Sequence, residues 1–82
     1  MNKSIHNHQY RLMISLLREE RLSRNITQKQ LATKLNVNQA IISKIETCER
    51  RIDFIELRQL CLALDLSPID FINKFEEALL II

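Results

Sequence analysis

The segment Thr27–Glu46, TQKQLATKLNVNQAIISKIE, carries the clearest structural pattern in this 82-residue chain. It opens with Thr27 and, three residues later, Gln30, which is the capping-box arrangement that begins a helix. Apolar residues then recur at the spacing of one helix face. They are Leu31, Ala32 and Leu35. The pattern predicts a short helix over Gln28–Leu35.

A second short helix is expected after a tight turn. Asn36 tolerates the left-handed backbone conformation better than most residues other than glycine. Asn38 is a good N-cap for a helix over residues 39 to about 47, whose inward side chains are Ile42 and Ile45. Val37 is expected to pack beneath the turn. Because Ala32 is small, the second helix can cross the first closely, so the segment predicts a rigid helix-turn-helix.

The rest of the chain adds three helices. One is expected over Tyr10–Leu22, Asp53 caps another, and Ser67 with Pro68 opens the last. The inward residues of the first are Met13, Leu17 and Leu16, and those of the helix after Asp53 are Phe54, Leu57, Leu60, Cys61 and Leu64. The chain has no glycine and one proline, whereas a β-rich fold needs several tight turns. We predict an all-α, five-helix domain over residues 10–82, preceded by a flexible tail over residues 1–9.

Charge is divided unevenly along the chain. Residues 1–51 carry ten Lys and Arg against four Asp and Glu, a balance of +6. Residues 52–82 carry two against six, a balance of −4, and the two balances sum to the net +2. One basic and one acidic half are typical of a polyanion binder with a separate partner-facing side. The alternative is a chance asymmetry on a solvated surface.

The exposed side of the second helix of the pair carries residue types that read base edges in a DNA major groove. Gln39 can bond adenine bidentately, Ala40 can contact a thymine methyl, and Ser43 can bond a base or a phosphate. Lys44 can reach a guanine or a phosphate, and Asn38 can do likewise besides capping. The residues expected to contact phosphates are Thr27, Gln28, Lys29, Lys34, Arg50 and Arg51. The alternative is a helix-turn-helix with a structural role alone.

Taken with its surroundings, this motif resembles the lambda-repressor/Cro family, also called the xenobiotic-response-element family. The resemblance covers residues 12 to 72, and the run quoted above, with the ERRI that follows shortly after it, carries it. It implies a lambda-repressor-like DNA-binding domain in which Gln28 binds a phosphate and braces Gln39. It also implies that Arg21 pairs with Glu46 inside the domain, which makes that pair structural.

The chain departs from the family at two positions. Family members usually have glycine where Asn36 and Cys48 stand. A side chain at Cys48 must accept a positive φ, or the loop after the second helix must take another course. The course of this loop determines whether Arg50 and Arg51 can contact phosphates.

The C-terminal segment has more apolar residues than one inward stripe needs. The surplus predicts a second buried face, and self-association into a homodimer is the simplest explanation. The expected dimerisation residues are Phe71, Phe75, Leu79, Leu80, Ile81 and Ile82. The alternative is a C-terminal arm that folds back over its own core.

Other chemistry finds little support in the sequence. Cys48 and Cys61 are too far apart for a CxxC motif, and His6 and His8 lack further ligands for a metal. Cys61 is expected to be a small buried hydrophobe, whereas Cys48 could be exposed. There is no glycine-rich phosphate loop and no nucleophile–base pair. We therefore expect no enzyme activity, no cofactor, no membrane association, and a cytoplasmic location.

Together these features predict a regulator of transcription that binds double-stranded DNA as a homodimer, either a repressor or the controller of a restriction-modification system. The rival hypothesis is a protein-interaction module, such as an antitoxin-like protein that binds a partner.

Overall fold

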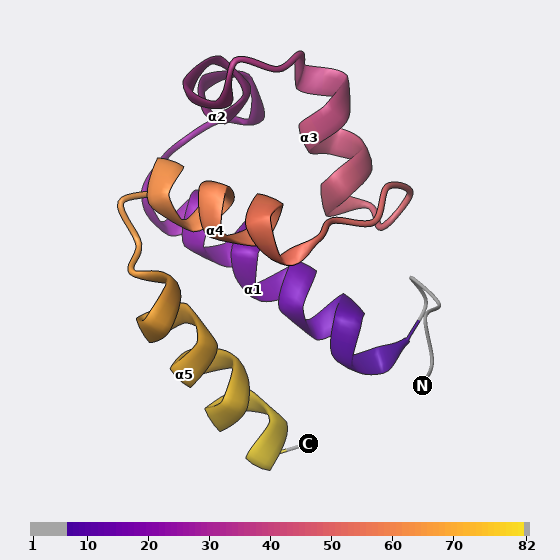
Figure 1. Cartoon of the computed structure of the whole chain (residues 1–82), viewed down its shortest axis with the longest axis vertical. Coiled ribbons are helices and arrows are strands. Elements are labelled where there is room, and N and C mark those ends of the chain that lie inside the picture. The colour runs from indigo at the N-terminus through magenta and orange to yellow at the C-terminus, as the bar shows by residue number, and fades with distance from the viewer. Residues whose placement is uncertain (1–6, 82) are drawn as a thin grey trace.

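The computed structural model describes residues 7–81, and within them it contains five helices and no strand (Figure 1). The helices are α1 (His8–Ser23), α2 (Gln28–Leu35), α3 (Gln39–Glu46), α4 (Phe54–Ala63) and α5 (Pro68–Leu80). The all-α, five-helix prediction is confirmed. Most of the expected tail, which includes His6, and the terminal Ile82 lie outside the described residues.

Side chains at the helix starts explain where the helices begin. The N-caps of α2 to α5 are those expected from the sequence, namely Thr27, Asn38, Asp53 and Ser67. The first helix begins at His8, two residues before the predicted Tyr10, because the Asn7 side-chain oxygen accepts hydrogen bonds from the backbone of Gln9 at 2.9 Å and of Tyr10 at 3.2 Å. This cap satisfies backbone donors that would otherwise lack partners.

Within residues 7–81 of this glycine-free chain, four residues in the turns take the left-handed backbone conformation. They are Asn25, Asn36, Cys48 and Asp65, with φ between 54° and 61°. Asn and Asp are enriched in this region, so three of the four are the expected types. Cys48, at φ 61°, accepts the conformation that a glycine would otherwise supply.

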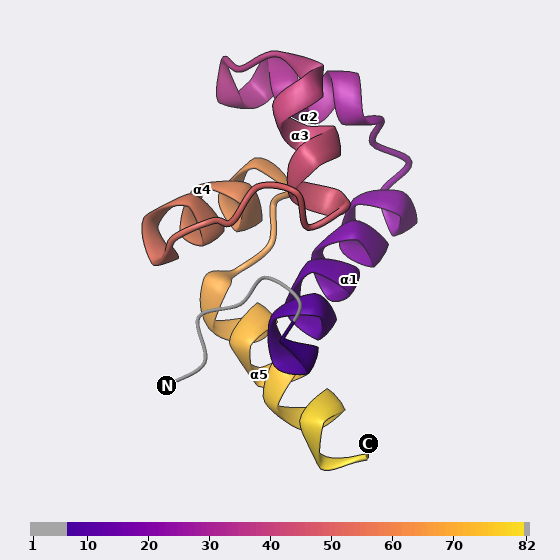
Figure 2. The ribbon, with the colours of Figure 1, turned by 90° about the vertical axis from the view of Figure 1, so that its right-hand side faces the viewer.

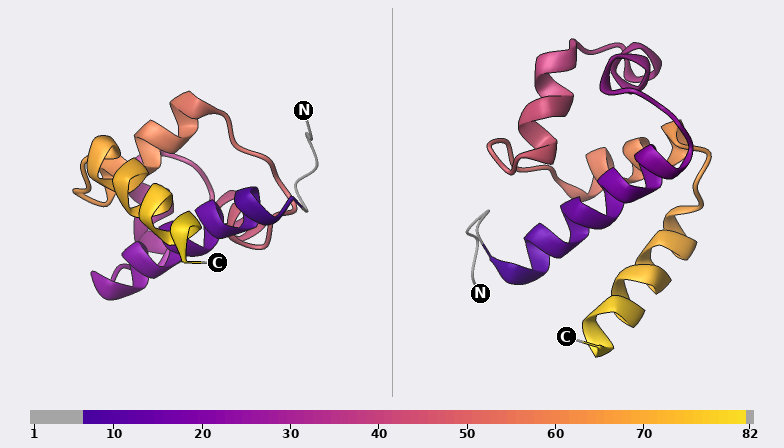
Figure 3. Two further views of the ribbon diagram at one scale, coloured as in Figure 1. Left: turned by 90° about the horizontal axis from the view of Figure 1, so that it is seen from below. Right: turned by 180° about the vertical axis from the view of Figure 1, so that it is seen from behind.

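The α2–α3 pair forms one part of the molecule and α1, α4 and α5 form the other, and the two parts share one core. The α2–α3 pair sits across one end of the molecule, and α1 contacts α3 and α5 (Figure 1, Figure 2). The last helix turns back beside α1 (Figure 3), where Lys74 Nζ lies 2.7 Å from Glu20 Oε1. The ion pair with Lys74 and a second with Arg24 lower the pKa of the Glu20 carboxyl. No helix within residues 7–81 is long and apolar enough to cross a membrane.

The core is mainly aliphatic and draws on all five helices. Its buried residues are Tyr10, Ile14, Leu17, Leu31, Ala32, Ile42, Ile45, Cys48, Ile52, Leu60, Cys61, Leu64, Leu66 and Phe71. Cys61 is fully buried, as expected of a small hydrophobe, and this burial raises the pKa of its thiol to about 11. Cys48 is also buried, so the possibility that it is exposed is wrong.

Three apolar residues lie elsewhere than the sequence indicates. Phe54, on the first turn of α4, is 64% exposed because that end of α4 projects beyond its neighbours (Figure 2). Val37 is 37% exposed at the edge of a hollow facing α4, so it does not pack beneath the turn. Phe71 is 1% exposed and fills the core of the single chain. Its assignment to a dimer interface is therefore wrong.

Truncation of Phe71 tests its place in the core. We expect Phe71→Ala to lower the free energy of unfolding by about 3–5 kcal/mol, because it removes a large buried side chain and leaves a cavity. Leu80→Ala, at a position that is 85% exposed, should change it by less than about 0.5 kcal/mol in dilute protein. Urea denaturation at two protein concentrations measures both. A destabilisation by Phe71→Ala that disappears on dilution would contradict the assignment.

Candidate nucleic-acid interface

The α2–α3 unit presents Gln39 at the first position of α3, on the surface. Its amide nitrogen Nε2 donates to Gln28 Oε1 at 3.5 Å, and Gln28 Nε2 donates in turn to Glu46 Oε1 at 3.0 Å. The sequence resemblance implied that Gln28 braces Gln39, and this contact is present. Two hydrogen bonds therefore connect the exposed amide to the far end of α3.

The chain of contacts ends on a buried ion pair. Arg21 Nε donates to Glu46 Oε2 at 2.7 Å and Arg21 Nη2 to Glu46 Oε1 at 2.9 Å, with 6% and 9% of the two side chains exposed. The third donor, Nη1, binds the backbone oxygen of Ile26 at 2.7 Å. One guanidinium thus ties α1 to the end of α3 and to the loop before α2. The ion pair expected from the sequence is present.

The remaining residues expected to read bases lie along the same helix. Ala40 and Lys44 are exposed, and Ser43 is half-buried. The Asn38 side-chain oxygen accepts a hydrogen bond from the backbone of Ile41 at 3.2 Å, so Asn38 serves the helix as a cap. The strip of α3 that reaches the surface consists of the exposed Gln39, Ala40 and Lys44 and the half-buried Ser43.

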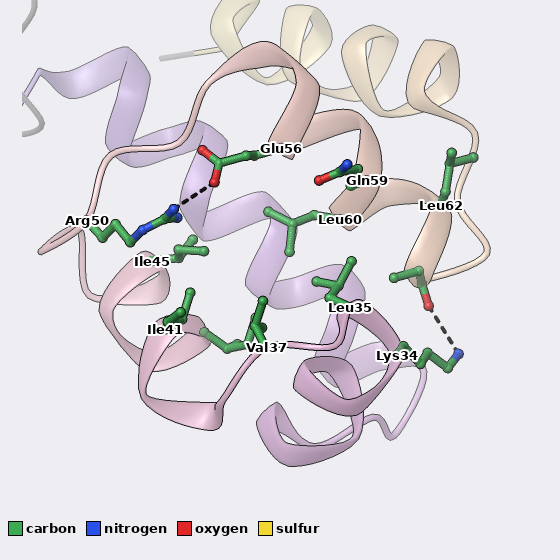
Figure 4. Close-up of a pocket in the computed structure, with 12 residues that line it drawn as sticks. Lys34, Leu35, Val37, Ile41, Ile45, Arg50, Glu56, Gln59, Leu60 and Leu62 are labelled. Carbon is green, nitrogen blue, oxygen red and sulfur yellow. Dashed lines mark hydrogen bonds and ion pairs between the residues drawn. The ribbon is translucent and has the colours of Figure 1, made fainter.

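Two side chains that were expected to contact phosphates, those of Arg50 and Lys34, bind other parts of the protein. Arg50 Nη2 binds Glu56 Oε2 at 2.7 Å, and Lys34 Nζ donates to the backbone oxygen of Ala63 at 3.1 Å. Figure 4 shows both side chains at the hollow of about 480 Å³ that lies between the α2–α3 unit and α4. The apolar side of α3, with Ile41, faces this hollow (Figure 4). The structure therefore does not bring Lys34 and Arg50 together with Gln39.

The other expected phosphate contacts remain near the start of α2 or the loop after α3. Lys29 is exposed on the first turn of α2. Thr27 Oγ1 accepts from the backbone of Gln30 at 3.0 Å, and the Gln30 side chain accepts from the backbone of Thr27 at 2.9 Å. The guanidinium of Arg51 lies 4.8 Å from the centre of the Tyr10 ring.

The loop after α3 is fixed by two features that the sequence left open. The left-handed Cys48 turns the chain, and its backbone N–H donates to Ile45 O at 3.1 Å. The Tyr10 hydroxyl then accepts a hydrogen bond from the backbone of Ile52 at 3.0 Å, and burial raises the pKa of that hydroxyl. The loop is thereby attached to α1 without a glycine.

Two cations of α1 beside α3 were not predicted from the sequence. Arg11 and Arg18 line a polar hollow together with the last residues of α3. Arg18 Nε lies 3.8 Å from Glu46 Oε1, and 58% of its side chain is exposed. The available signal was the spacing of seven residues, which places both cations on one face of a helix.

The Arg21–Glu46 pair should dominate the stability of this unit. We expect Arg21→Met to lower the free energy of unfolding by about 3 kcal/mol or more, because it leaves a buried carboxylate without its bidentate partner. Glu46→Leu should have a similar effect on the stranded guanidinium. The double variant should recover part of the stability, since two apolar side chains bury no charge. Urea denaturation of all four proteins gives the coupling energy. Simple additivity of the two single effects would show that the ion pair is not the stabilising element.

The comparisons with known proteins agree with this arrangement. The family model described as helix-turn-helix matches residues 17–71. The solved structure of an XRE-family like protein from Pseudomonas syringae pv. tomato str. DC3000 is similar, with a TM-score of 0.84 and 39% sequence identity over 93% of each chain. No curated protein matches the chain. The chain belongs to the XRE-type helix-turn-helix family of DNA-binding regulators.

Proposed function

We propose that this chain is a sequence-specific transcriptional regulator, a repressor or the controller of a restriction-modification system, and that it reads operator DNA with α3 in the major groove. The main support for the proposal is the position of the Gln39 side-chain amide. It is exposed, and its 3.5 Å contact with Gln28 leads back to the buried Arg21–Glu46 pair. An amide that a neighbouring side chain already orients can form a bidentate contact with adenine at a lower entropic cost.

The surroundings of Gln39 support the same role. Ala40 and Lys44 extend the exposed strip toward the C-terminal end of α3. The backbone N–H groups at the start of α2, beside Thr27 and Gln28, suit a DNA phosphate, and Lys29 adds a positive charge there. A phosphate bound at this end would fix the register of α3 in the groove.

Removal of the reading side chains tests the proposal. Duplexes selected from random sequence by the wild-type protein should bind with salt-sensitive affinity. The double variant Gln39→Ala with Lys44→Ala removes two base contacts of about 1–3 kcal/mol each. We therefore expect its Kd for the selected duplex to rise at least about thirtyfold. Fluorescence anisotropy at fixed salt measures this change.

A matched control removes the same residue types from the other side of the unit. Gln59→Ala with Lys34→Ala deletes one amide and one ammonium that line the hollow toward α4, and its Kd should stay close to that of the wild type. Equal increases in Kd for the two double variants would overturn the assignment of α3 as the reading helix. Weak binding of every duplex, with a protein that co-purifies tightly, would favour the partner-binding rival.

We further propose that the regulator acts as a homodimer through α5. Ile69, Ile72 and Leu80 share one outer face of this helix at 100° per residue and are 72%, 41% and 85% exposed. Phe54 and Ile72 also line a hollow of about 360 Å³ between α4 and α5. Phe75 and Leu79 are half-buried, and Ile81 is 84% exposed. A second copy would cover this surface and place two reading helices about 34 Å apart, one turn of DNA.

Polar substitution on the outer face of α5 tests the dimer. Ile69→Ser with Leu80→Ser should weaken self-association at least about tenfold while the fold persists, because both side chains are largely exposed in the single chain. The control, Leu22→Ser with Leu62→Ser, changes exposed apolar residues on α1 and on the other side of α4 and should leave the dimer intact. Sedimentation equilibrium measures both. A wild-type mass of one chain at all concentrations up to about 100-fold above the DNA Kd would refute the dimer.

A further inference from the structure

A polar hollow of about 440 Å³ lies between the N-terminal half of α1 and the C-terminal end of α3. The face of α1 that lines it carries Arg11, Ser15 and Arg18, at the i, i+4, i+7 spacing of one helix face. Glu46 and Thr47 line it from the side of α3. This hollow is separate from the one between α3 and α4 that Lys34 and Arg50 line.

The hollow carries a surplus of positive charge. The Glu46 carboxylate is bound by the buried guanidinium of Arg21 and also lies 3.8 Å from Arg18 Nε, so one negative charge is shared between two guanidinium groups. Arg18 is 58% exposed and directed to the surface beside this pair. Among the residues that line the hollow, Arg11 and Arg18 thus stand beside a single carboxylate, that of Glu46.

The hollow lies on the same side of α3 as the reading strip. Gln39, Ser43 and Glu46 follow one another at the i, i+4, i+7 spacing, so they share one side of α3. Arg18 adjoins Glu46 at the end of that row. Ile41 and Ile45 belong to the opposite, apolar side, toward α4. DNA that meets Gln39 and Ser43 therefore runs past the α1 face that carries Arg18.

The loop after α3 brings another cation to the same end. Arg51 stacks over the Tyr10 ring, and the Tyr10 hydroxyl binds the backbone of Ile52, so the loop is held against the N-terminal half of α1. Arg11 is the next residue along α1. Arg51 of the loop thus lies over α1 at Tyr10, next in the chain to Arg11.

We propose that Arg11 and Arg18, with the Ser15 hydroxyl between them, bind the DNA backbone as a second phosphate site. The first phosphate site proposed above lies at the start of α2, where Gln28 binds Glu46 Oε1, the same oxygen that Arg18 adjoins. The second site therefore continues from the first along α1. This inference rests on the proposed DNA-binding function and assigns to α1 the role expected, from residue types alone, of Lys34 and Arg50.

Salt dependence of DNA binding separates this role from base reading. Counterion release predicts that removing one phosphate-binding cation lowers the slope of log K against log salt by about 0.9, which weakens binding by about eightfold at 0.1 M salt. We expect Arg11→Gln with Arg18→Gln to lower the slope by about 1.8 for each bound subunit. The affinity should fall equally for the selected duplex and for a scrambled duplex, because phosphate contacts carry no sequence information.

The matched control is Lys34→Gln with Arg50→Gln, which removes the same charge from the side that faces α4. For this control, the slope of log K against log salt should change by less than half of the change expected for Arg11→Gln with Arg18→Gln. The reason is that exposed charges farther than about 10 Å from the DNA are largely screened at 0.1 M salt. Urea denaturation of each variant confirms that it is folded. Equal slope changes in the two double variants, with wild-type binding intact, would overturn the second phosphate site and leave the proposed function standing. Failure of the wild type to bind any duplex would instead overturn the proposed function.

Discussion

The bidentate pair of Arg21 and Glu46 holds α1, α3 and the loop before α2 together. It joins a helix near the start of the chain to the last residue of α3, and a third bond from the same guanidinium fixes the loop before α2. Because the pair is almost wholly buried, neither charge can move without losing its partner. Gln28 adds a further bond to the same carboxylate. The orientation of α3 is thereby set by electrostatics at one end, while apolar packing supplies the rest.

The chain has no glycine, so residues with a side chain take the left-handed backbone conformation in its turns. Asn25, Asn36 and Asp65 supply three of the left-handed turns, and Cys48 supplies the fourth at a cost of about 1 kcal/mol for a residue with a Cβ atom. Burial of Cys48 and the bond between Tyr10 and the backbone of Ile52 offset that cost. The loop after α3 is therefore a fixed platform for Arg51.

The helix α3 divides its two sides between different tasks. The side with Gln39, Ser43 and Glu46 is polar and adjoins the basic face of α1, whereas the side with Ile41 lines the hollow toward α4. In the proposed complex, a charge next to the polar side acts on bound DNA, and a charge next to the apolar side is screened from it. The proposal thus assigns each arginine and lysine an effect on binding according to the side of α3 on which it lies.

Residue order alone was enough to predict the helices and the strip of residues on the outer side of α3, because both depend on the spacing of residues along the chain. It also predicted most of the helix caps, because a capping side chain binds the backbone close to it in sequence. The Arg21–Glu46 pair could also be named in advance, though only from family resemblance, since 25 residues separate its partners. Only the folded chain reveals that Phe71 belongs to the core, that Lys34 and Arg50 turn toward α4, and that Arg11 and Arg18 stand beside α3. Periodicity identifies the faces of one helix, whereas the neighbour that covers each face is set by how all five helices pack.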